Sequence, residues 1–303
     1  MKYSLPRITA IAAGIVLALT TLAISQEEAS RAAQFSGPEL VRRAAAQMTQ
    51  HPSLEAKIRL RINLFDQALA ANGYYEHLRY DDENRFRLEL RMQVGDKLTS
   101  LQQTNDGRYL WTRRDLGADL SLGRVDLVRI RNALKDRDSS TFLANPAWFG
   151  IGGLSQLLRG LSEHFSFGRA AVDEVNGIPV WRLQGVWNQQ ALARLFPDQA
   201  EQILAGAAAP LDKLPPHLPD RVRIVFDRGE KIPLFPYRIE FSRCDPATQR
   251  QRPMLAIDFF EVRLRPDFDP RRFTFQIGEQ RVEDETEDFL QKLRLGPAKP
   301  NAK

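Results

Sequence analysis

The sequence contains one cysteine and four histidines among 303 residues. A lone cysteine, Cys244, excludes intramolecular disulfides and zinc sites built from several cysteines. Four scattered histidines supply too few ligands for a histidine-rich centre, so neither a metal ion nor another cofactor is expected. The chain also lacks the Gly-x-Ser-x-Gly motif of serine hydrolases. We therefore expect a protein that is not an enzyme and has no catalytic residues.

A large excess of one charge is also missing. The chain has 43 Lys and Arg residues against 38 Asp and Glu residues, a net charge of +5. This excess is small for the chain length and does not favour a nucleic-acid partner. Because 43% of the residues are hydrophobic, the chain can fold around a sizeable core without covalent cross-links.

The first 25 residues have the composition of a secretory signal peptide. Lys2 and Arg7 form a basic start, and residues 8–24 are uncharged and mostly apolar. Ala23-Ile24-Ser25 then offers a small-x-small cleavage site before Gln26. We expect residues 1–25 to be removed, which leaves residues 26–303 as one domain in the periplasm. An uncleaved N-terminal membrane anchor is the alternative, since the apolar run is near the lower length limit for spanning a bilayer.

The spacing of apolar residues changes from a helical period to a period of two near residue 53. A helix is expected to begin at Ser36 and to end at His51-Pro52. Short turns, one of them at Asn72-Gly73, separate the alternating segments that follow. These predict strands over residues 53–64, 74–80, 85–92, 97–103 and 108–113. Each strand has one apolar and one charged face, which is typical of an antiparallel sheet covered on one side.

Basic residues occupy the charged face of these strands: Lys57, Arg59, Arg61, Arg85, Arg87 and Arg91. Such a row could bind nucleic acid, but Glu55, Glu76 and Glu89 interleave with it. We interpret the row as a solvated sheet face that also discourages edge-to-edge aggregation.

Three glycines, Gly150, Gly152 and Gly153, precede an amphipathic helical pattern over residues 154–165. No Lys-Ser or Lys-Thr follows them, so they do not form a phosphate-binding loop. We interpret them as a flexible joint.

The second half of the chain repeats the strand pattern around a loop rich in proline and alanine near residues 206–220. This loop is expected to be an insertion. Strands are predicted over residues 166–172, 178–187, 221–227, 237–244 and 253–264, with a short last strand at 273–275 and a final helix over 284–293.

The order of these elements resembles the LolA/LolB lipoprotein-carrier family. The resemblance is carried by residues 40–64, by Gly107-Arg108-Tyr109-Leu110-Trp111, and by Phe268-Asp269-Pro270-Arg271-Arg272-Phe273-Thr274-Phe275, which is similar to an Asp-Pro-x-x-Phe-x-Phe ending of that family. It implies an α+β fold, a strongly curved antiparallel sheet (a half-open barrel) covered by helices. Without a cysteine near residue 25 for lipid attachment, the chain is more similar to the soluble LolA-type branch. It departs from the family in its greater length, and no arginine can be singled out as the family's lid-locking residue.

The resemblance implies a carrier or binder of lipid or lipoprotein acyl chains, a monomer that contacts the membrane only peripherally or transiently. Its apolar cavity would be either open or filled by the helices. The expected wall is Leu60, Ile62, Leu64, Phe86, Leu88, Leu90, Met92 and Trp111, and the expected lid is Trp148, Phe149, Leu154, Leu157, Leu158 and Leu161. The alternative is a structural module of the cell envelope that binds an envelope protein or an anionic polymer through the arginine-rich sheet face.

Overall fold

The structure is a computed structural model that describes residues 36–64, 67–80, 83–117, 119–135, 148–245, 248–265 and 268–292. The expected signal peptide at residues 1–25 lies outside these ranges. No helix within them is long and apolar enough to cross a bilayer.

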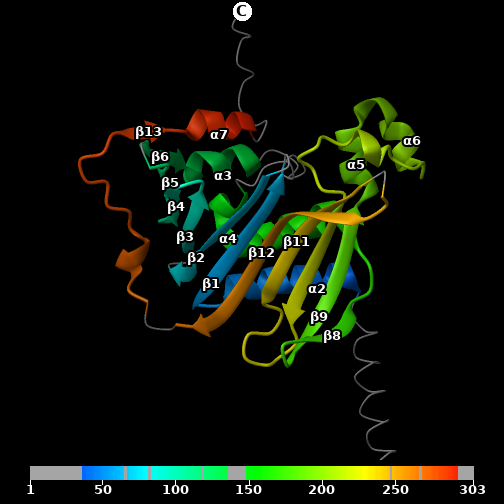
Figure 1. Ribbon diagram of the computed structural model, residues 1–303, viewed down its shortest axis with the longest axis horizontal. Coiled ribbons are helices and arrows are strands. Elements are labelled where there is room, and N and C mark those ends of the chain that lie inside the picture. Colours follow the sequence, from blue (N-terminus) through cyan, green and yellow to red (C-terminus); the bar gives the residue numbers. More distant parts are fainter. Residues whose placement is uncertain are drawn as a thin grey trace, which may run out of the picture.

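One curved sheet forms the body of the molecule (Figure 1). The described residues contribute 13 strands in the order β13-β6-β5-β4-β3-β2-β1-β12-β11-β10-β9-β7, with β8 also pairing with β9. The two ends of this order do not pair with each other, so the sheet is unclosed. The strands are β1 (Ser53–Leu64), β2 (Gln67–Tyr80), β3 (Glu83–Val94), β4 (Lys97–Asn105), β5 (Tyr109–Asp115), β6 (Leu120–Asp126), β7 (Phe165–Phe167), β8 (Ala171–Val175), β9 (Ile178–Trp187), β10 (Arg221–Asp227), β11 (Pro236–Cys244), β12 (Gln251–Leu264) and β13 (Val282–Asp284).

Helices cover one face of the sheet, which we call the inner face; the other is the outer face. In Figure 1, α2 and α4 lie behind the sheet, and they pack against each other and against β3, β4 and β7. The helices are α2 (Gly37–Gln50), α3 (Leu127–Lys135), α4 (Trp148–His164), α5 (Gln189–Leu195), α6 (Ala200–Leu204) and α7 (Thr286–Lys292), with 3₁₀ turns η2 (Pro197–Gln199), η3 (Leu211–Lys213) and η4 (Pro270–Phe273). The predicted α+β class and curved, mostly antiparallel sheet are confirmed.

Helix α2 begins and ends where the sequence predicts. The Ser36 hydroxyl accepts a hydrogen bond from the Glu39 amide at 3.4 Å, and His51 is the C-cap. Its apolar stripe is buried: Leu40, Val41, Ala44, Ala45 and Met48. The helix therefore contributes one whole face to the core.

The predicted turn at Asn72-Gly73 is wrong, because both residues lie in the middle of β2. The chain reverses instead between Leu64 and Gln67, which pair with each other. A Cβ atom on Gly73 would lie 1.7 Å from the Glu89 carbonyl oxygen. Gly73 therefore allows β2 and β3 to approach each other closely. Close approach of another backbone is a common reason for glycine inside a strand.

The predicted last strand at residues 273–275 is also wrong. Asp269 accepts a hydrogen bond from the Arg271 amide at 2.9 Å and caps the 3₁₀ turn η4. The last strand is β13, which pairs in parallel with β6 at one end of the sheet. Its three residues are too few to show an alternating pattern in the sequence.

The loop rich in proline and alanine, residues 206–220, is hydrogen-bonded to side chains of the sheet. The Arg243 guanidinium donates to the carbonyl oxygens of Leu214 at 2.7 Å and Pro215 at 2.6 Å. The Trp187 indole N–H donates to the Pro219 carbonyl oxygen at 2.6 Å. These bonds hold a segment that has little regular structure of its own.

Candidate ligand-binding site on the inner face

An apolar layer lies between the inner face of the sheet and the helices that cover it. The strand register arranges its side chains in rows across the sheet. In the central row Ala56 pairs with Tyr75 and Tyr75 with Leu88. In a row nearer the C-terminal end of β1, Ile257 pairs with Leu60, Leu60 with Ala71, and Ala71 with Met92. The layer is therefore continuous over β12, β1, β2 and β3.

The centre of the layer is tightly packed. Phe86 on β3 and Leu154, Leu158 and Leu161 on α4 are each at most 1% exposed, and Leu88 and Leu90 are buried beside them. These six residues were predicted as wall and lid, and the structure brings them together in one core cluster. At this point the helix fills the space above the sheet.

Tyr75 connects the sheet to α4 at this centre. Its hydroxyl accepts a hydrogen bond from the Leu154 amide at 3.2 Å, and burial raises the pKa of this hydroxyl. Its ring lies 6.0 Å from that of Phe259 in an edge-to-face arrangement. The sequence alone did not single out Tyr75, because its place in the alternation of β2 is no different from that of any core residue.

Gly153 has a fixed conformation that only glycine adopts readily. Its φ of 62° and ψ of −148° interrupt α4. A Cβ atom there would lie 2.7 Å from the Tyr75 hydroxyl oxygen. The interpretation of this position as a flexible joint is therefore incomplete, since Gly153 also provides the room in which Tyr75 reaches the helix.

The layer becomes more open toward the C-terminal end of β1. Leu60, Ile257 and Met92, which share one row, are half-buried and pack against the core cluster, as does Leu101 in the row before, and Ile62 is half-buried one row further on. Leu157 on α4 is also half-buried and packs against the core cluster. Apolar side chains that are continuous with a core and yet reach solvent are suited to an apolar ligand. We call this part the open end of the layer.

The structure does not place the other predicted wall and lid residues, Leu64, Trp111, Trp148 and Phe149, in the apolar layer. The backbones of Leu64, Trp148 and Phe149 belong to β1 and α4, but their side chains are outside what the structure describes. Trp111 pairs with Thr104, which pairs with Arg87, and this register places Trp111 on the outer face. It is therefore not part of the wall; its ring stacks on Phe275 at 5.4 Å.

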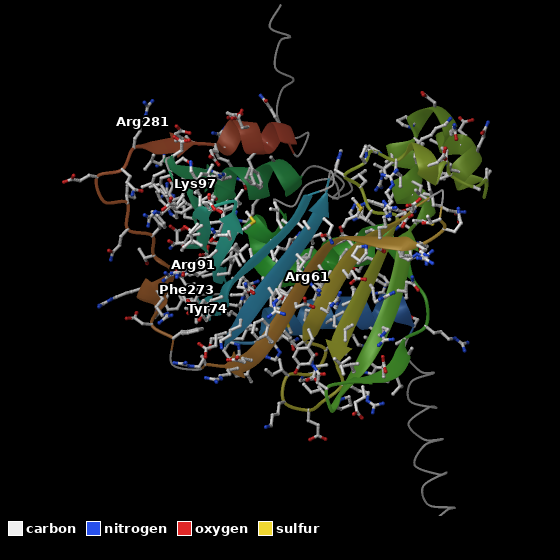
Figure 2. All side chains as sticks on the ribbon, in the orientation of Figure 1. Arg61, Tyr74, Arg91, Lys97, Phe273 and Arg281 are labelled. Atoms are coloured by element: carbon white, nitrogen blue, oxygen red, sulfur yellow. The ribbon has the colours of Figure 1, made fainter. Side chains whose placement is uncertain are left out.

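The outer face carries the basic residues that the sequence predicts, including Arg61 and Arg91 (Figure 2). Three of these six basic residues have acidic partners in the described part of the chain. Arg61 contacts Asp258 at 2.8 Å and Lys57 contacts Glu261 at 2.6 Å, both on the neighbouring strand β12, and Arg87 contacts Glu89 on its own strand. An anionic polymer would have to compete with these ion pairs, which agrees with the interpretation of a solvated face.

Candidate metal ligands are sparse in the part of the chain that the structure describes. No group of three or more His, Cys, Asp or Glu side chains there is arranged to hold a metal ion.

No family model and no curated protein matches the sequence. Similar solved structures include LprF from Mycobacterium bovis, with a TM-score of 0.36 and 10% identity over 74% of this chain and 91% of that one. The lipoprotein LppX from Mycobacterium tuberculosis has a TM-score of 0.35 and 12% identity over 75% and 96%. A putative outer membrane lipoprotein-sorting protein domain from Vibrio parahaemolyticus has a TM-score of 0.33 and 11% identity over 78% and 96%. At these scores we draw no conclusion about family or function from the matches.

Proposed function

We propose that this protein is a non-enzymatic carrier or binder of lipid or lipoprotein acyl chains in the periplasm. The observation that carries the proposal is the open end of the apolar layer, where half-buried Leu60, Met92 and Ile257 continue a fully buried core. An acyl chain lying on these side chains would remove them from water and leave its polar end in solvent. No catalytic group is required for this task.

The energetics favour a long chain over a short one. Each methylene group removed from water contributes roughly 0.8 kcal/mol, so affinity should rise with chain length until the open end is filled. A longer chain can extend further only if α4 moves away from Tyr75, because Leu154 and Leu158 already occupy the centre. Deep binding would then break the hydrogen bond between Leu154 and Tyr75.

Displacement of a fluorescent fatty-acid probe from the mature chain tests the proposal. Leu60→Asn places a polar amide at the open end and should weaken binding about tenfold, since it removes apolar contact from the ligand. Leu98→Asn is the matched control, because Leu98 is 61% exposed. Its neighbour Thr99 pairs with Met92 on the inner face, so Leu98 lies on the outer face. Equal effects of the two substitutions, or no probe binding by the unmodified protein, would contradict the proposal.

Export to the periplasm is part of the same proposal and rests on residues 1–25. The mature protein should begin at Gln26 and should be monomeric. N-terminal sequencing of protein from the envelope fraction checks the first residue, and a retained Met1 would favour the membrane anchor instead.

A further inference from the structure

The exposed leucines of the protein gather at one end of the sheet. Among the leucines whose side chains the structure describes, six are exposed. Five of them lie at the end where β1 stops and the apolar layer is open: Leu98, Leu116, Leu120, Leu204 and Leu211. The sixth, Leu264, pairs with Leu54 at the opposite end of the sheet. Single exposed leucines are normal on a protein surface, whereas a concentration of them marks an interaction surface.

Three of the five leucines belong to hairpin turns on one side of the open end. Leu98 lies beside the turn between β3 and β4, and Leu116 and Leu120 lie at the turn between β5 and β6. The two turns are neighbours, because a Cβ atom added to Gly117 would lie 3.4 Å from the Lys97 side chain. Strands β3 and β5 run parallel to β1, so both turns lie at the end of the sheet where β1 stops.

The other two leucines belong to the segment between β9 and β10. Strand β9 also runs parallel to β1, so α5 and α6 lie beyond the same end of the sheet, at the upper right in Figure 1. In this segment residues 203–211 read Ile-Leu-Ala-Gly-Ala-Ala-Ala-Pro-Leu and contain no charged or hydrogen-bonding side chain. Ile203 is 1% exposed and anchors the segment, whereas Leu204 is 55% and Leu211 is 41% exposed.

The backbone of this segment has a defined conformation. Gly206 ends α6 with a φ of 101°, its amide donates to the Ile203 carbonyl oxygen at 3.0 Å, and the Ala207 amide donates to the Gln202 carbonyl oxygen at 2.9 Å. This is the pattern of a glycine C-cap. Residues 204–208 are all exposed around it. Amides that are bonded within the chain can enter apolar surroundings at lower cost than amides that depend on water.

We propose that this end of the protein docks on the surface of a lipid bilayer, with the five leucines in its interfacial region. The two groups of leucines lie on opposite sides of the open end. Seven strand spacings separate β4 from β9, which is roughly 34 Å along the curved sheet. A bilayer is wide enough to contact both groups. It also requires none of the large aromatic or arginine anchors that are typical of protein interfaces, and residues 203–211 have none.

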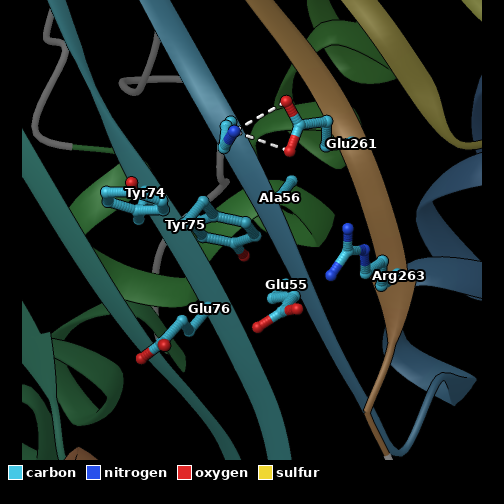
Figure 3. A pocket seen from close by; sticks show the side chains of 8 residues that line it. Glu55, Ala56, Tyr74, Tyr75, Glu76, Glu261 and Arg263 are labelled. Carbon is cyan, nitrogen blue, oxygen red and sulfur yellow. Dashed lines mark hydrogen bonds and ion pairs between the residues drawn. The ribbon is translucent and has the colours of Figure 1, made fainter.

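The outer face of the sheet is less suited to this contact because it is charged. Figure 3 shows a part of it near β1 and β12, where Glu55, Glu261 and Arg263 line a cleft. Lys57 pairs with Glu261 there, and Arg265 pairs with Glu55. Transfer of these charged groups toward hydrocarbon would be costly, whereas transfer of exposed leucines is favourable.

Docking by this end brings the open end of the apolar layer to the bilayer surface. An acyl chain can then pass between the bilayer and the layer with little exposure to water. This consequence rests on the proposed function, whereas the docking depends only on the exposed leucines.

Co-sedimentation of the full mature chain with phosphatidylcholine vesicles tests the docking. Leu204→Gln and Leu211→Gln, made together because one leucine of five supplies only part of the contact, should weaken binding about tenfold. Val175→Gln with Ile178→Gln is the matched control. These two residues are 40% and 41% exposed and pair with each other at the opposite end of β9. The control should bind like the unmodified protein, and thermal melts check that both double variants are folded.

Salt separates this contact from an electrostatic one. Raising the NaCl concentration from about 0.05 M to about 0.5 M should change vesicle affinity less than about twofold, because the docking residues carry no charge. Binding that is lost in high salt would assign the contact to basic residues and overturn the proposal. Absence of vesicle binding by the unmodified protein, or an equal loss in the two double variants, would also overturn it.

Sedimentation velocity without vesicles tests the other occupant of this surface. The unmodified protein should be a monomer. A dimer that dissociates when Leu204 and Leu211 are replaced would assign the surface to a second copy of the chain and overturn the proposal. The fluorescent fatty-acid probe should bind the same double variant and the unmodified protein equally well in solution. Failure of the docking is therefore distinct from failure of the acyl-chain proposal.

Discussion

Two residues at the centre of the apolar layer, Tyr75 and Gly153, depend on each other. The Tyr75 hydroxyl accepts the Leu154 amide hydrogen bond in a space that a side chain on Gly153 would occupy. The three glycines before the helix were visible in the sequence, but their contact with Tyr75 was not, because the two segments are more than seventy residues apart. Spacing along a chain shows where glycine is, and only the packed fold shows what it makes room for.

Tyr75→Phe should destabilise the protein by about 1–3 kcal/mol, because it leaves the buried Leu154 amide without an acceptor. It should also speed the entry of an apolar dye, since α4 would be held less firmly. Urea denaturation and stopped-flow fluorescence measure the two effects. Tyr74→Phe is the matched control, because Tyr74 is largely exposed; a similar loss in both variants would contradict the role given to Tyr75.

Gly153→Ala should also destabilise the protein. The free energy of unfolding should fall by an amount of order 1–3 kcal/mol, because a residue with a side chain is strained in this backbone conformation. Gly160 lies in the same helix, and a Cβ atom added there meets nothing within 4 Å. Gly160→Ala should therefore be neutral or stabilising by up to about 1 kcal/mol, since alanine favours helix. Thermal melts of the two variants compare them directly. If alanine were tolerated equally well at both positions, the flexible-joint interpretation alone would suffice.

At the scale of the element, alternation predicted most strands well. The pattern Phe86, Leu88, Leu90 and Met92 lies on the inner face of β3, and the charged residues between them lie on the outer face. Alternation failed where another constraint decided the structure: Gly73 serves the close approach of two strands, and β13 is too short to have a pattern. It also could not decide the face of Trp111, which Phe275 covers from the C-terminal segment.

The register of β3 has a direct test. Leu88→Asp places a charge in the core and should cost several kcal/mol, of order 3–5, because the carboxylate finds no partner there. Arg87→Gln should cost less than about 1 kcal/mol, since the Arg87 pair with Glu89 is partly exposed to solvent. Chemical denaturation compares the two free energies of unfolding, and equal losses would mean that the faces of β3 are assigned wrongly.

At the scale of the whole molecule, the C-terminal segment joins the two faces of the sheet. Phe275 lies on the outer face against Trp111, β13 extends the sheet beside β6, and α7 buries Phe289 and Leu290 in the inner core. The Arg114 guanidinium donates to both oxygens of Glu285 at 2.7 and 2.9 Å, directly above Gly123. The sequence predicted a final helix but not the path of the C-terminal segment from the outer face to the inner core. That path depends on contacts between segments far apart in the chain.

Global stability should fall in mild acid because of His77. Burial lowers the pKa of His77 to about 4, and the nearby charge of His51 lowers it further while a hydrogen bond to the His51 backbone opposes the shift. An unfolded histidine titrates near 6.5, so the unfolded chain takes up the proton first. The stabilisation is complete above about pH 6.5 and is lost as the pH falls toward 4, with a total of order 3 kcal/mol.

Unfolding free energies measured between pH 7 and pH 4 should show this loss in the unmodified protein and a smaller loss in His77→Gln. His217 is exposed, so His217→Gln should leave the pH dependence unchanged. A pH dependence that is the same in His77→Gln and the unmodified protein would assign the acid sensitivity to other groups.

Native mass spectrometry of the protein purified from its own membranes tests the acyl-chain proposal most directly. The spectrum should contain a species heavier than the mature chain by the mass of one lipid or acylated ligand. That species should be lost in Leu60→Asn and retained in Leu98→Asn. If the unmodified protein carried no such ligand, and exogenous lipids added none, the apolar layer would be only a folded core and the proposed function would be wrong.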